Sequence, residues 1–416
     1  MIGYGEALAI LRKATPPPSV CRGAPIAGQF LAEAVVSRED LPPFDNSAMD
    51  GFALRVGVGG TRAGLKFEVK GAQAAGDTAT TANGGAWEIM TGARVPEGLD
   101  AVIPVEQVEV LESDRAGRPQ RIRLNADVPQ GQHIRTRGED VSRGEIVLAA
   151  GTRLEAAQLM LLAALGVAEV TTVQAPRVAL INTGRELVDD PGRPLASGQI
   201  RNSNGPFLAQ RIVEAGAELV LRETVSDDAD AFIAALQRAL AAGARVVLST
   251  GAVSMGRHDF VPDALRGLGA TLHFHKIRIR PGKPLLFATL PGGQLFFGLP
   301  GNPVSSAVGL RFFVEPVLRG MLGLEPEQPL RVPLAASYRK HHSLRFLLKG
   351  RLAVDADGRL RAQILQGQES FRIAPLARSN AWIVLDEQAQ DLPEGAFVDV
   401  HGLGHLQAPQ LKGWDP

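Results

Sequence analysis

The sequence has little cysteine, few aromatic residues and no excess of charge of either sign. Cys21 is its single cysteine, which excludes an internal disulfide and a zinc site built from several thiolates, and which suits a reducing compartment. Lysine plus arginine and aspartate plus glutamate number 44 each, so the formal charge is zero. This balance argues against a general nucleic-acid binder and against attachment to anionic lipid by charge. Any anionic ligand must therefore be bound by a local group of residues.

Long hydrophobic runs are also absent from the sequence. No stretch reaches about 18 uninterrupted apolar residues, the length from which a membrane-spanning helix is inferred. The first short apolar run precedes Arg12 and Lys13, which is the wrong order for a signal peptide. We therefore expect a cytoplasmic protein that binds neither membranes nor nucleic acid.

The length of 416 residues predicts several domains, because one hydrophobic core rarely grows so large. Apolar spacing predicts a first helix that ends before Pro16, and further helices at 28–36 and 154–165. Short apolar runs separated by glycine, proline and asparagine predict an inserted β domain. The expected domains are a helical and extended linker domain at 1–40 and 132–174, the β domain at 41–131, an α/β domain at 175–327 and a C-terminal β domain at 328–416.

From Arg177 onward, strands, glycine-rich loops and helices alternate, which is typical of a mostly parallel sheet with helices on its faces. Asn302 followed by Pro303 is a suitable start for one long helix that ends near Met321. The fold class that we predict is multidomain α/β plus β, with a central three-layer α/β domain, an inserted β domain, a small helical and extended segment, and a C-terminal domain similar to a β-barrel. Other helices are expected at 205–215, 229–241 and 260–268.

Ligands of open parallel sheets bind beyond the carboxyl ends of the strands, where helix N-termini point their positive ends. Loops at 182–187, 249–260, 278–284 and 298–306 are therefore the informative ones. Thr250, Gly251 and Ser254 offer hydroxyl and backbone N–H groups to a phosphate, although a strand-to-helix turn also needs glycine. No loop fits a phosphate-binding P-loop or a dinucleotide fingerprint, which disfavours an NTPase and a nicotinamide oxidoreductase.

Charged residues concentrate in the same loops. Lys276, Arg280 and Lys283 are candidate anion ligands, with a solvated basic edge as the alternative interpretation. Three carboxylates, those of Glu186, Asp227 and Asp259, follow predicted strands and fit the oxygen ligands that Mg²⁺ prefers. Helix capping by Asp227 or Asp228 and by Asp259 is the alternative for these acidic residues.

A second polar concentration lies in the β domain. Four polar residues surround Met49, more than a turn needs, which indicates a ligand surface or a subunit contact. The segment around Thr91 and Gly92 has the same character. The four residues are Asp45, Asn46, Ser47 and Asp50.

Eight ordered segments resemble the bacterial molybdopterin molybdenumtransferase (MoeA) family, whose relatives include the E domain of gephyrin and the plant molybdenum insertase. The resemblance spans nearly the whole chain. The segments are PPFDNSAMDGFA, IMTGARVPEGLDAVIPVE, RTRGEDV, TGREL, GQIRNSN, GAVSMGRHDF, RPGKP and GLPGNPVSS.

The resemblance implies a transferase that converts adenylated molybdopterin and molybdate to molybdenum cofactor and AMP in a Mg²⁺-dependent reaction. It further implies a homodimer of elongated four-domain subunits, in which the α/β domain of one subunit and the β domain of the other form the active cleft. Its α/β domain resembles the molybdopterin-binding domain of the adenylyltransferase that makes the substrate. The expected partners are this adenylyltransferase and the molybdoenzymes that accept the cofactor.

The resemblance and the positions of residues in the loops together suggest residue roles. Catalysis is expected of Asp50, Asp227, Asp259 and Lys276. Mg²⁺ coordination is expected of Glu186, Asp227 and Asp259. Substrate binding is expected of Thr91, Thr183, Gly251, Ser254, Arg280, Lys283, Pro300, Ser305 and Ser370.

The chain departs from the family pattern at several positions. Arg185 replaces an acidic residue, Ala252 a glycine and Arg280 a lysine. Asn202 and Gly205 replace the aspartate and arginine usual in DSNR, so one loop loses an acid and a base. In the C-terminal domain, a loosely matching segment leaves Arg345 or Lys349 as candidate anion ligands. Two rivals to an insertase therefore remain: an adenylyltransferase, and a cofactor-binding or scaffold paralogue with weakened catalysis.

Overall fold

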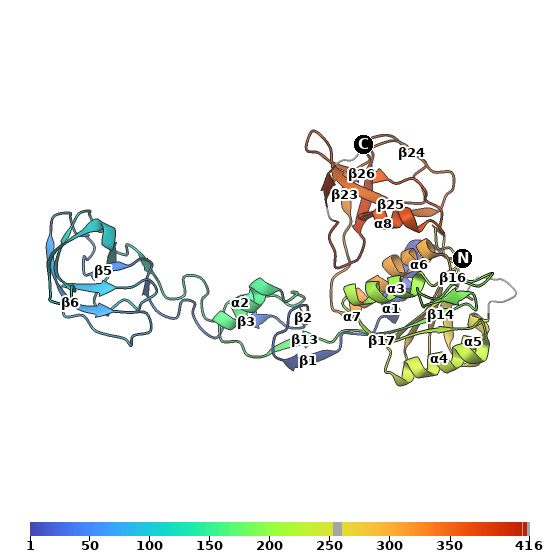
Figure 1. Cartoon of the computed structure of the whole chain (residues 1–416), viewed down its shortest axis with the longest axis horizontal. Coiled ribbons are helices and arrows are strands. Elements are labelled where there is room, and N and C mark those ends of the chain that lie inside the picture. Colours follow the sequence, from blue (N-terminus) through green and yellow to red (C-terminus); the bar gives the residue numbers. More distant parts are fainter. Residues whose placement is uncertain (253–259, 410, 414–416) are drawn as a thin grey trace. The chain divides into compact units, whose positions relative to one another are not determined.

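A computed structural model describes residues 1–252, 260–409 and 411–413 of the chain (Figure 1). The chain divides into two compact units, which we describe separately. The first comprises Met1–Cys21, Gly28–Ala32 and Thr172–Pro416, and the second comprises Arg22–Ala27 and Glu33–Thr171. The predicted fold class is confirmed, whereas the four domain boundaries stay a proposal.

The first unit is built around a six-stranded sheet with the order β17-β14-β18-β22-β21-β19. The first four strands pair in parallel, and only β21 runs against them, because it is antiparallel to both β22 and β19. The predicted mostly parallel sheet is therefore confirmed. Their bounds are β14 Arg177–Thr183, β17 Glu218–Val225, β18 Val246–Thr250, β19 Thr271–Phe274, β21 Leu286–Thr289 and β22 Leu295–Leu299.

Helices cover both faces of this sheet (Figure 1). Successive residues of β14 alternate between two cores, with Leu180 facing α3 and α6 and Ile181 facing α4 and α5. Two separate hydrophobic layers therefore hold the sheet. The helices are α3 Asn204–Glu214, α4 Ala229–Ala241, α5 Val261–Gly267 and α6 Pro303–Gly309.

The predicted long helix after Asn302 is present but has a π turn in its middle. It runs as α6, the π segment η2 at Leu310–Val314 and α7 at Glu315–Met321. Pro316 cannot donate a backbone hydrogen bond, which breaks the regular ladder of the helix at the π turn. The π turn directs Arg311 and Phe312 into the protein interior.

The C-terminal region forms a mixed sheet with its own core. Its order is β20-β25-β27-β29-β23, and β26 and β30 also pair with β25. Strand β20 comes from the α/β region and pairs Ile279 with Arg345, so the 278–284 loop joins this sheet. The bounds are β20 Ile279–Arg280, β23 Leu330–Pro333, β25 Arg345–Val354, β26 Leu360–Ile364, β27 Ala381–Leu385, β29 Phe397–Gly402 and β30 Lys412–Gly413, with helix α8 at Ile373–Arg378 and the pair β24 Tyr338–Arg339 and β28 Asp391–Leu392.

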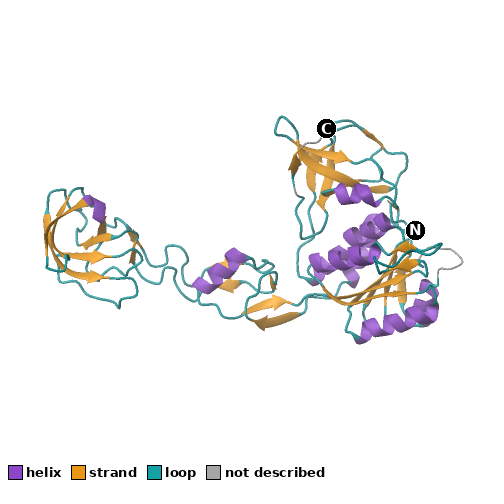
Figure 2. Cartoon of the chain, viewed as in Figure 1, coloured by secondary structure: helices purple, strands orange, loops and turns teal. Residues whose placement is uncertain are grey.

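The second unit is mostly β, as Figure 2 shows by its strand colouring. Its main sheet has the order β8-β5-β7-β6-β10-β9, and residues such as Phe52, Ile103 and Ile122 form its core. The strands are β5 Gly51–Leu54, β6 Lys66–Gln73, β7 Ala86–Ile89, β8 Ala101–Pro104, β9 Val108–Ser113 and β10 Pro119–Leu124, accompanied by η1 Val105–Gln107, the pair β4 Asn46–Ser47 and β11 Ile134–Arg135, and helix α2 Ala156–Ala164.

The predicted N-terminal helix is present as α1, Tyr4–Ala14, and ends before the proline run. The prediction of a helix at 28–36 is wrong, because this segment forms the short strands β2 Phe30–Leu31 and β3 Val35–Val36. Strand β2 pairs with β13, Val170–Val173, and β3 pairs with β12, Ile146–Leu148. Pairing with distant strands therefore overrides the local helical pattern. Strand β1, Val20–Gly23, also pairs with β13.

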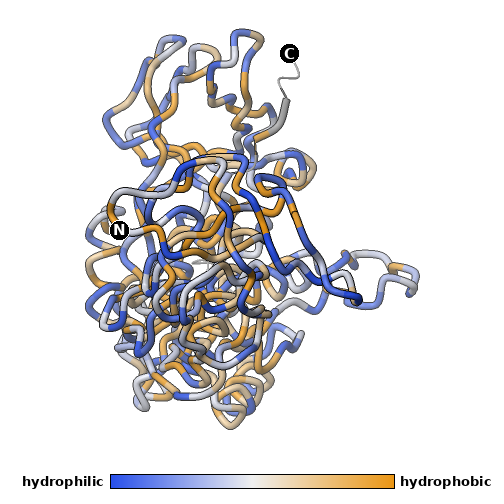
Figure 3. The backbone as a smooth tube through the Cα atoms, turned by 90° about the vertical axis from the view of Figure 1, so that its left-hand side faces the viewer, coloured by the Kyte–Doolittle hydropathy of each residue, from blue (hydrophilic) through white to orange (hydrophobic). Residues whose placement is uncertain are grey.

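Hydrophobic and hydrophilic segments alternate at short range along the backbone (Figure 3). Among the described residues, no helix is long and apolar enough to cross a membrane.

Candidate active site

Strand ends of the six-stranded sheet bring three of the predicted loops into contact. The Thr183 hydroxyl donates to the Thr250 carbonyl at 3.0 Å, and the Gly251 N–H donates to the Leu299 carbonyl at 3.2 Å. A Cβ on Gly251, at φ +86°, would lie 2.7 Å from the Thr183 carbonyl oxygen. Only glycine permits this close approach, and its backbone is thereby held at the edge where an anion can reach it.

Ala252 continues this loop in a left-handed conformation with φ +51°. Few residues other than glycine, asparagine and aspartate adopt this region readily. The family's glycine at this position therefore has a steric reason, and this chain accepts backbone strain beside the site. Ser254 and Asp259 lie outside the described residues.

Two of the predicted carboxylates, Glu186 and Asp227, come from adjacent loops. The loops meet where the Gly184 N–H donates to the Val225 carbonyl at 3.1 Å. A Cβ on Gly184 would lie 2.8 Å from Glu186 Oε1, so this carboxylate lies over the glycine. Asp227 Oδ2 accepts from the Arg185 N–H at 3.3 Å.

The helix cap in this loop is Asp228 and not Asp227. Asp228 Oδ2 accepts from the Ala231 N–H at 2.8 Å and caps α4, which leaves the neighbouring Asp227 without that role. Among the described residues no three His, Cys, Asp or Glu side chains form a metal cluster. Mg²⁺ is commonly bound by one or two carboxylates together with water and substrate phosphate, so Glu186 and Asp227 fit this ion.

The basic 278–284 loop packs beside the first turn of α6. A Cβ on Gly282 would lie 3.4 Å from the Ser305 carbonyl, and the Ser370 carbonyl accepts from the Val304 N–H at 3.0 Å. Three features thus lie together at the N-terminus of α6: Ser305, Ser370 and the turn that precedes Lys283. Such a helix end attracts anions. The preceding loop is closed by a hydrogen bond from the Ser306 hydroxyl to the Pro300 carbonyl.

The predicted cations differ in their surroundings. Lys283 is exposed and Lys276 is half-buried, and neither makes an ion pair within the described part of the chain. Their backbone carbonyls accept from Ile277 and Ile2, at 3.0 Å in both cases. The Arg280 guanidinium carbon lies 5.5 Å above the ring of Phe346, which fixes the side chain against the C-terminal sheet.

Lys349 is fully buried and supports the loop that carries Ser370. Its Nζ donates to the carbonyls of Gly367, Glu369 and Arg372 at 2.6, 3.2 and 3.2 Å. Burial lowers the pKa of this lysine. The sequence predicted Lys349 only as a candidate anion ligand. Its actual partners are backbone carbonyls, which every residue has and which a sequence pattern therefore does not reveal.

In the second unit, Asp50 and Thr91 lie together on the surface. Asp50 Oδ1 accepts from the Thr91 N–H at 2.6 Å. Hydrogen bonds from the backbone and side chain of Thr91 hold the pKa of Asp50 below its ordinary value. Asp50 also lines a cavity of about 350 Å³ with Glu88 and Met90. Asn46 and Ser47 instead make local hydrogen bonds that shape the turn, and Asp45 Oδ1 accepts from the distant Arg137 N–H at 2.7 Å.

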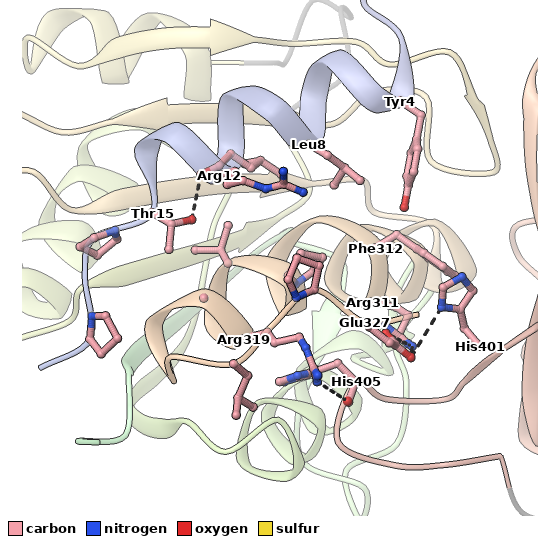
Figure 4. A pocket seen from close by; sticks show the side chains of 18 of the residues that line it. Tyr4, Leu8, Arg12, Thr15, Arg311, Phe312, Arg319, Glu327, His401 and His405 are labelled. Carbon is pink, nitrogen blue, oxygen red and sulfur yellow. Dashed lines mark hydrogen bonds and ion pairs between the residues drawn. The ribbon is translucent and has the colours of Figure 1, made fainter. Parts of the chain in front are cut away.

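A separate cavity of about 400 Å³ lies between α1, α7 and β29 and includes none of the predicted site residues (Figure 4). One wall holds paired charges: both Glu327 carboxylate oxygens accept from Arg311 Nη2 at 2.7 Å, and the His401 ring lies 3.6 Å from Glu327. Burial would raise the pKa of Glu327, but His401 and Arg311 lower it to about 2. These side chains join the α/β region to the C-terminal region.

Three family models match successive parts of the chain. The MoeA N-terminal region, domains I and II, matches residues 2–166. The probable molybdopterin binding domain matches residues 179–320, and the MoeA C-terminal region, domain IV, matches residues 331–403.

Curated relatives and solved structures agree with these matches. The chain is 39% identical over 382 residues to a molybdopterin molybdenumtransferase of Synechococcus elongatus, which covers 90% of this chain and 92% of the relative. A protein of the same name from Haemophilus influenzae is 33% identical over 390 residues, covering 91% and 92%.

The molybdopterin biosynthesis moeA protein of Pyrococcus horikoshii has a similar structure, with a TM-score of 0.80, 27% identity and complete coverage of both chains. A second structure of that protein gives a TM-score of 0.78 and covers 96% of this chain and 99% of that chain. This protein therefore belongs to the MoeA family of molybdopterin molybdenumtransferases.

Proposed function

We propose that this protein inserts molybdenum into the dithiolene of adenylated molybdopterin and so forms molybdenum cofactor. Its substrates are molybdate and adenylated molybdopterin, and AMP is released in a Mg²⁺-dependent step. The curated relatives carry the name of this activity. The observation that carries the proposal is the sheet edge, where glycine-rich loops and two carboxylates follow neighbouring strands and the basic turn packs beside the first turn of α6.

The chemistry of the substrates fits these groups. Molybdate is a dianion and the adenylated pterin carries a diphosphate, so the site needs cations and N–H donors. Lys276, Lys283 and the backbone of Gly251 supply them. When bound, Mg²⁺ offsets charge as the phosphoanhydride bond breaks and AMP leaves. Molybdenum then bonds to the two sulfur atoms of the pterin, which explains why one cysteine suffices in the protein.

Glu186 and Asp227 would hold the Mg²⁺, together with Asp259, which lies outside the described residues. Thr183, Pro300, Ser305 and Ser370 shape the anion site, as does Arg280. Ser254 is proposed as a further phosphate contact in the loop outside the described residues.

The Asp50–Thr91 pair belongs to the second unit, and we propose that it completes the site of a second copy of the chain in a homodimer. Mixing Asp50→Ala and Lys276→Ala subunits after gentle dissociation should then restore activity that neither variant has alone. Mixed dimers without activity would reject the shared site.

We further propose a cytoplasmic location, with molybdopterin adenylyltransferase and cofactor-accepting molybdoenzymes as partners. The function is tested in a strain that lacks its own insertase, with molybdoenzyme activity measured at low molybdate. The wild-type gene should restore that activity, and Lys276→Ala should not. Soluble wild-type protein that restores nothing would reject the proposal, and pyrophosphate release from ATP, Mg²⁺ and molybdopterin would favour an adenylyltransferase.

A further inference from the structure

The loop from Ile200 to Gly205, which lacks the usual acid and base, is held by a different set of contacts. Asn202 is buried, and its Oδ1 accepts from the Gly205 N–H at 2.8 Å at the start of α3. Asn202 Nδ2 donates to Asp189 Oδ1 at 3.0 Å and to the Thr224 hydroxyl at 3.1 Å. An aspartate at 202 has no donor and would place a second carboxylate against Asp189. Asparagine is therefore the residue that this arrangement requires.

Gly205 leaves space for a guanidinium from a neighbouring strand. Arg222 of β17 donates from Nη2 to Asp189 Oδ1 at 3.0 Å, and these two side chains are 34% and 44% exposed. A Cβ on Gly205 would lie only 2.8 Å from that same Nη2. An acid and a base are thus both present at the start of α3, although they come from Asp189 and Arg222 and not from the loop itself.

Asp189 lies in a segment that begins beside Glu186. Strand β15, Leu187–Val188, pairs with β16, Ile200–Arg201, and the Ile200 N–H donates to the Glu186 carbonyl at 2.8 Å. Asp189 follows β15 directly, so its ion pair fastens this segment to β17. Glu186 lies only three residues before Asp189, and the pairing of β15 with β16 keeps the residues between them in place.

We propose that Arg222 is a positioning residue of the active site, which acts with Asp189 to hold the segment that carries Glu186. The inference rests on the proposed function, because it takes Glu186 to be a Mg²⁺ ligand. A partly exposed ion pair contributes little to global stability. We therefore expect its loss to make the segment more mobile and to weaken metal binding.

Arg222→Ala is the direct test, and Arg238→Ala is its matched control. Arg238 also forms an ion pair with a residue of β17, Glu223, at 2.6 Å, but it lies on α4 away from the segment. Amide hydrogen exchange over residues 187–203 should become faster in Arg222→Ala and stay unchanged in Arg238→Ala. The midpoint of thermal unfolding should be similar in both.

Metal binding is measured on the same proteins with Mn²⁺ as a stand-in for Mg²⁺, by electron paramagnetic resonance. Arg222→Ala should bind Mn²⁺ about tenfold more weakly than wild type, as is usual when a group supporting a metal ligand is removed. The Mg²⁺ concentration for half-maximal turnover should rise by a similar factor, and excess Mg²⁺ should restore turnover.

Gly205→Ala provides an independent variant that leaves Arg222 in place. Its new methyl group would lie 2.8 Å from both Arg222 Nη2 and Asn202 Nδ2, the two donors to Asp189, so it should also weaken Mn²⁺ binding, although alanine favours a helix. Gly267→Ala in α5 is the control, because a Cβ there meets no atom within 4 Å.

Equal Mn²⁺ binding by Arg222→Ala, Gly205→Ala and their controls would overturn the inference. A wild-type protein that binds Mn²⁺ but inserts no molybdenum would instead count against the proposed function. The metal-binding difference between Arg222→Ala and Arg238→Ala decides the positioning role in either case.

Discussion

The first unit contains two groups of charged residues with opposite arrangements. In the interior, Glu315 is fully buried and lies between Arg211 at 2.8 Å and Arg311 at 3.5 Å, while Arg311 also binds Glu327. At the sheet edge, Lys276 and Lys283 make no ion pair within the described part of the chain. The interior charges are satisfied by one another and stabilise the fold. We propose that the edge charges bind a ligand.

Breaking the interior group should have the largest effect on stability. Glu315→Ala leaves Arg211 and Arg311 buried without their shared partner, which should lower the free energy of unfolding by about 3–5 kcal/mol. Urea denaturation of the purified protein measures this change. Arg331→Ala, which removes an exposed ion pair with Asp399, is the control and should change little. A similar loss of unfolding free energy in both variants would contradict the claim that the interior charges matter more for stability than exposed ones.

Removing an edge charge should affect activity instead of stability. Lys276→Ala should lower turnover by about 100-fold, the usual cost of losing one group that stabilises developing charge. Its free energy of unfolding should stay within about 0.5 kcal/mol of wild type. Arg266→Ala, in an exposed ion pair on α5, serves as the control for a lost surface cation. Normal turnover by Lys276→Ala would remove this residue from the site.

Acid should weaken the interior group through His405. Burial lowers the pKa of His405 to about 3, despite its hydrogen bond with the Ala215 carbonyl. The unfolded chain binds a proton below pH 6.5 and the folded chain does not, so stability is lost as the pH falls from 6.5 towards 3. Glu327, with a pKa of about 2, adds a loss below pH 4.5, whereas Glu315, whose pKa burial raises, opposes it.

Urea denaturation at pH 7 and pH 5 should therefore show a steeper loss of stability in wild type than in His405→Gln. Equal slopes would mean that His405 is not buried as a neutral ring.

The smallest expected effect on stability comes from relieving the backbone strain of Ala252 at the sheet edge. Ala252→Gly should raise the free energy of unfolding by about 1 kcal/mol, because glycine adopts the left-handed conformation without a steric cost. Thermal unfolding measures the gain. Ala242→Gly, at the C-cap of α4 with φ −71°, is a comparison at which no such gain is expected.

Local signals explain what the sequence could predict. Helix α4 was predicted at 229–241 and has those bounds, because its apolar spacing and its cap, Asp228, lie within the segment itself. The glycine loops followed from the same strand-to-helix alternation. The helix predicted at 28–36 was wrong because Phe30 and Leu31 pair with residues near position 172. Long-range pairing of this kind leaves no local pattern.

Site residues could be predicted where their own side chain has the required chemistry. They could not be predicted where their role depends on which residues lie beside them in the fold. Glu186, Asp227 and Lys283 stand out because carboxylates and amines follow predicted strands. Arg222 does not, since its position beside Gly205 depends on the pairing of β14 with β17 and on the direction of α3. The roles of all these residues remain predictions.

Direct assay of the purified protein tests the central claim most closely. Wild type is incubated with adenylated molybdopterin, molybdate and Mg²⁺, and molybdenum bound to the pterin and AMP are both quantified. We predict one AMP released for each molybdenum inserted, with both products formed about 100-fold more slowly by Lys276→Ala. AMP release without molybdenum insertion, or no product from wild-type protein, would contradict the account.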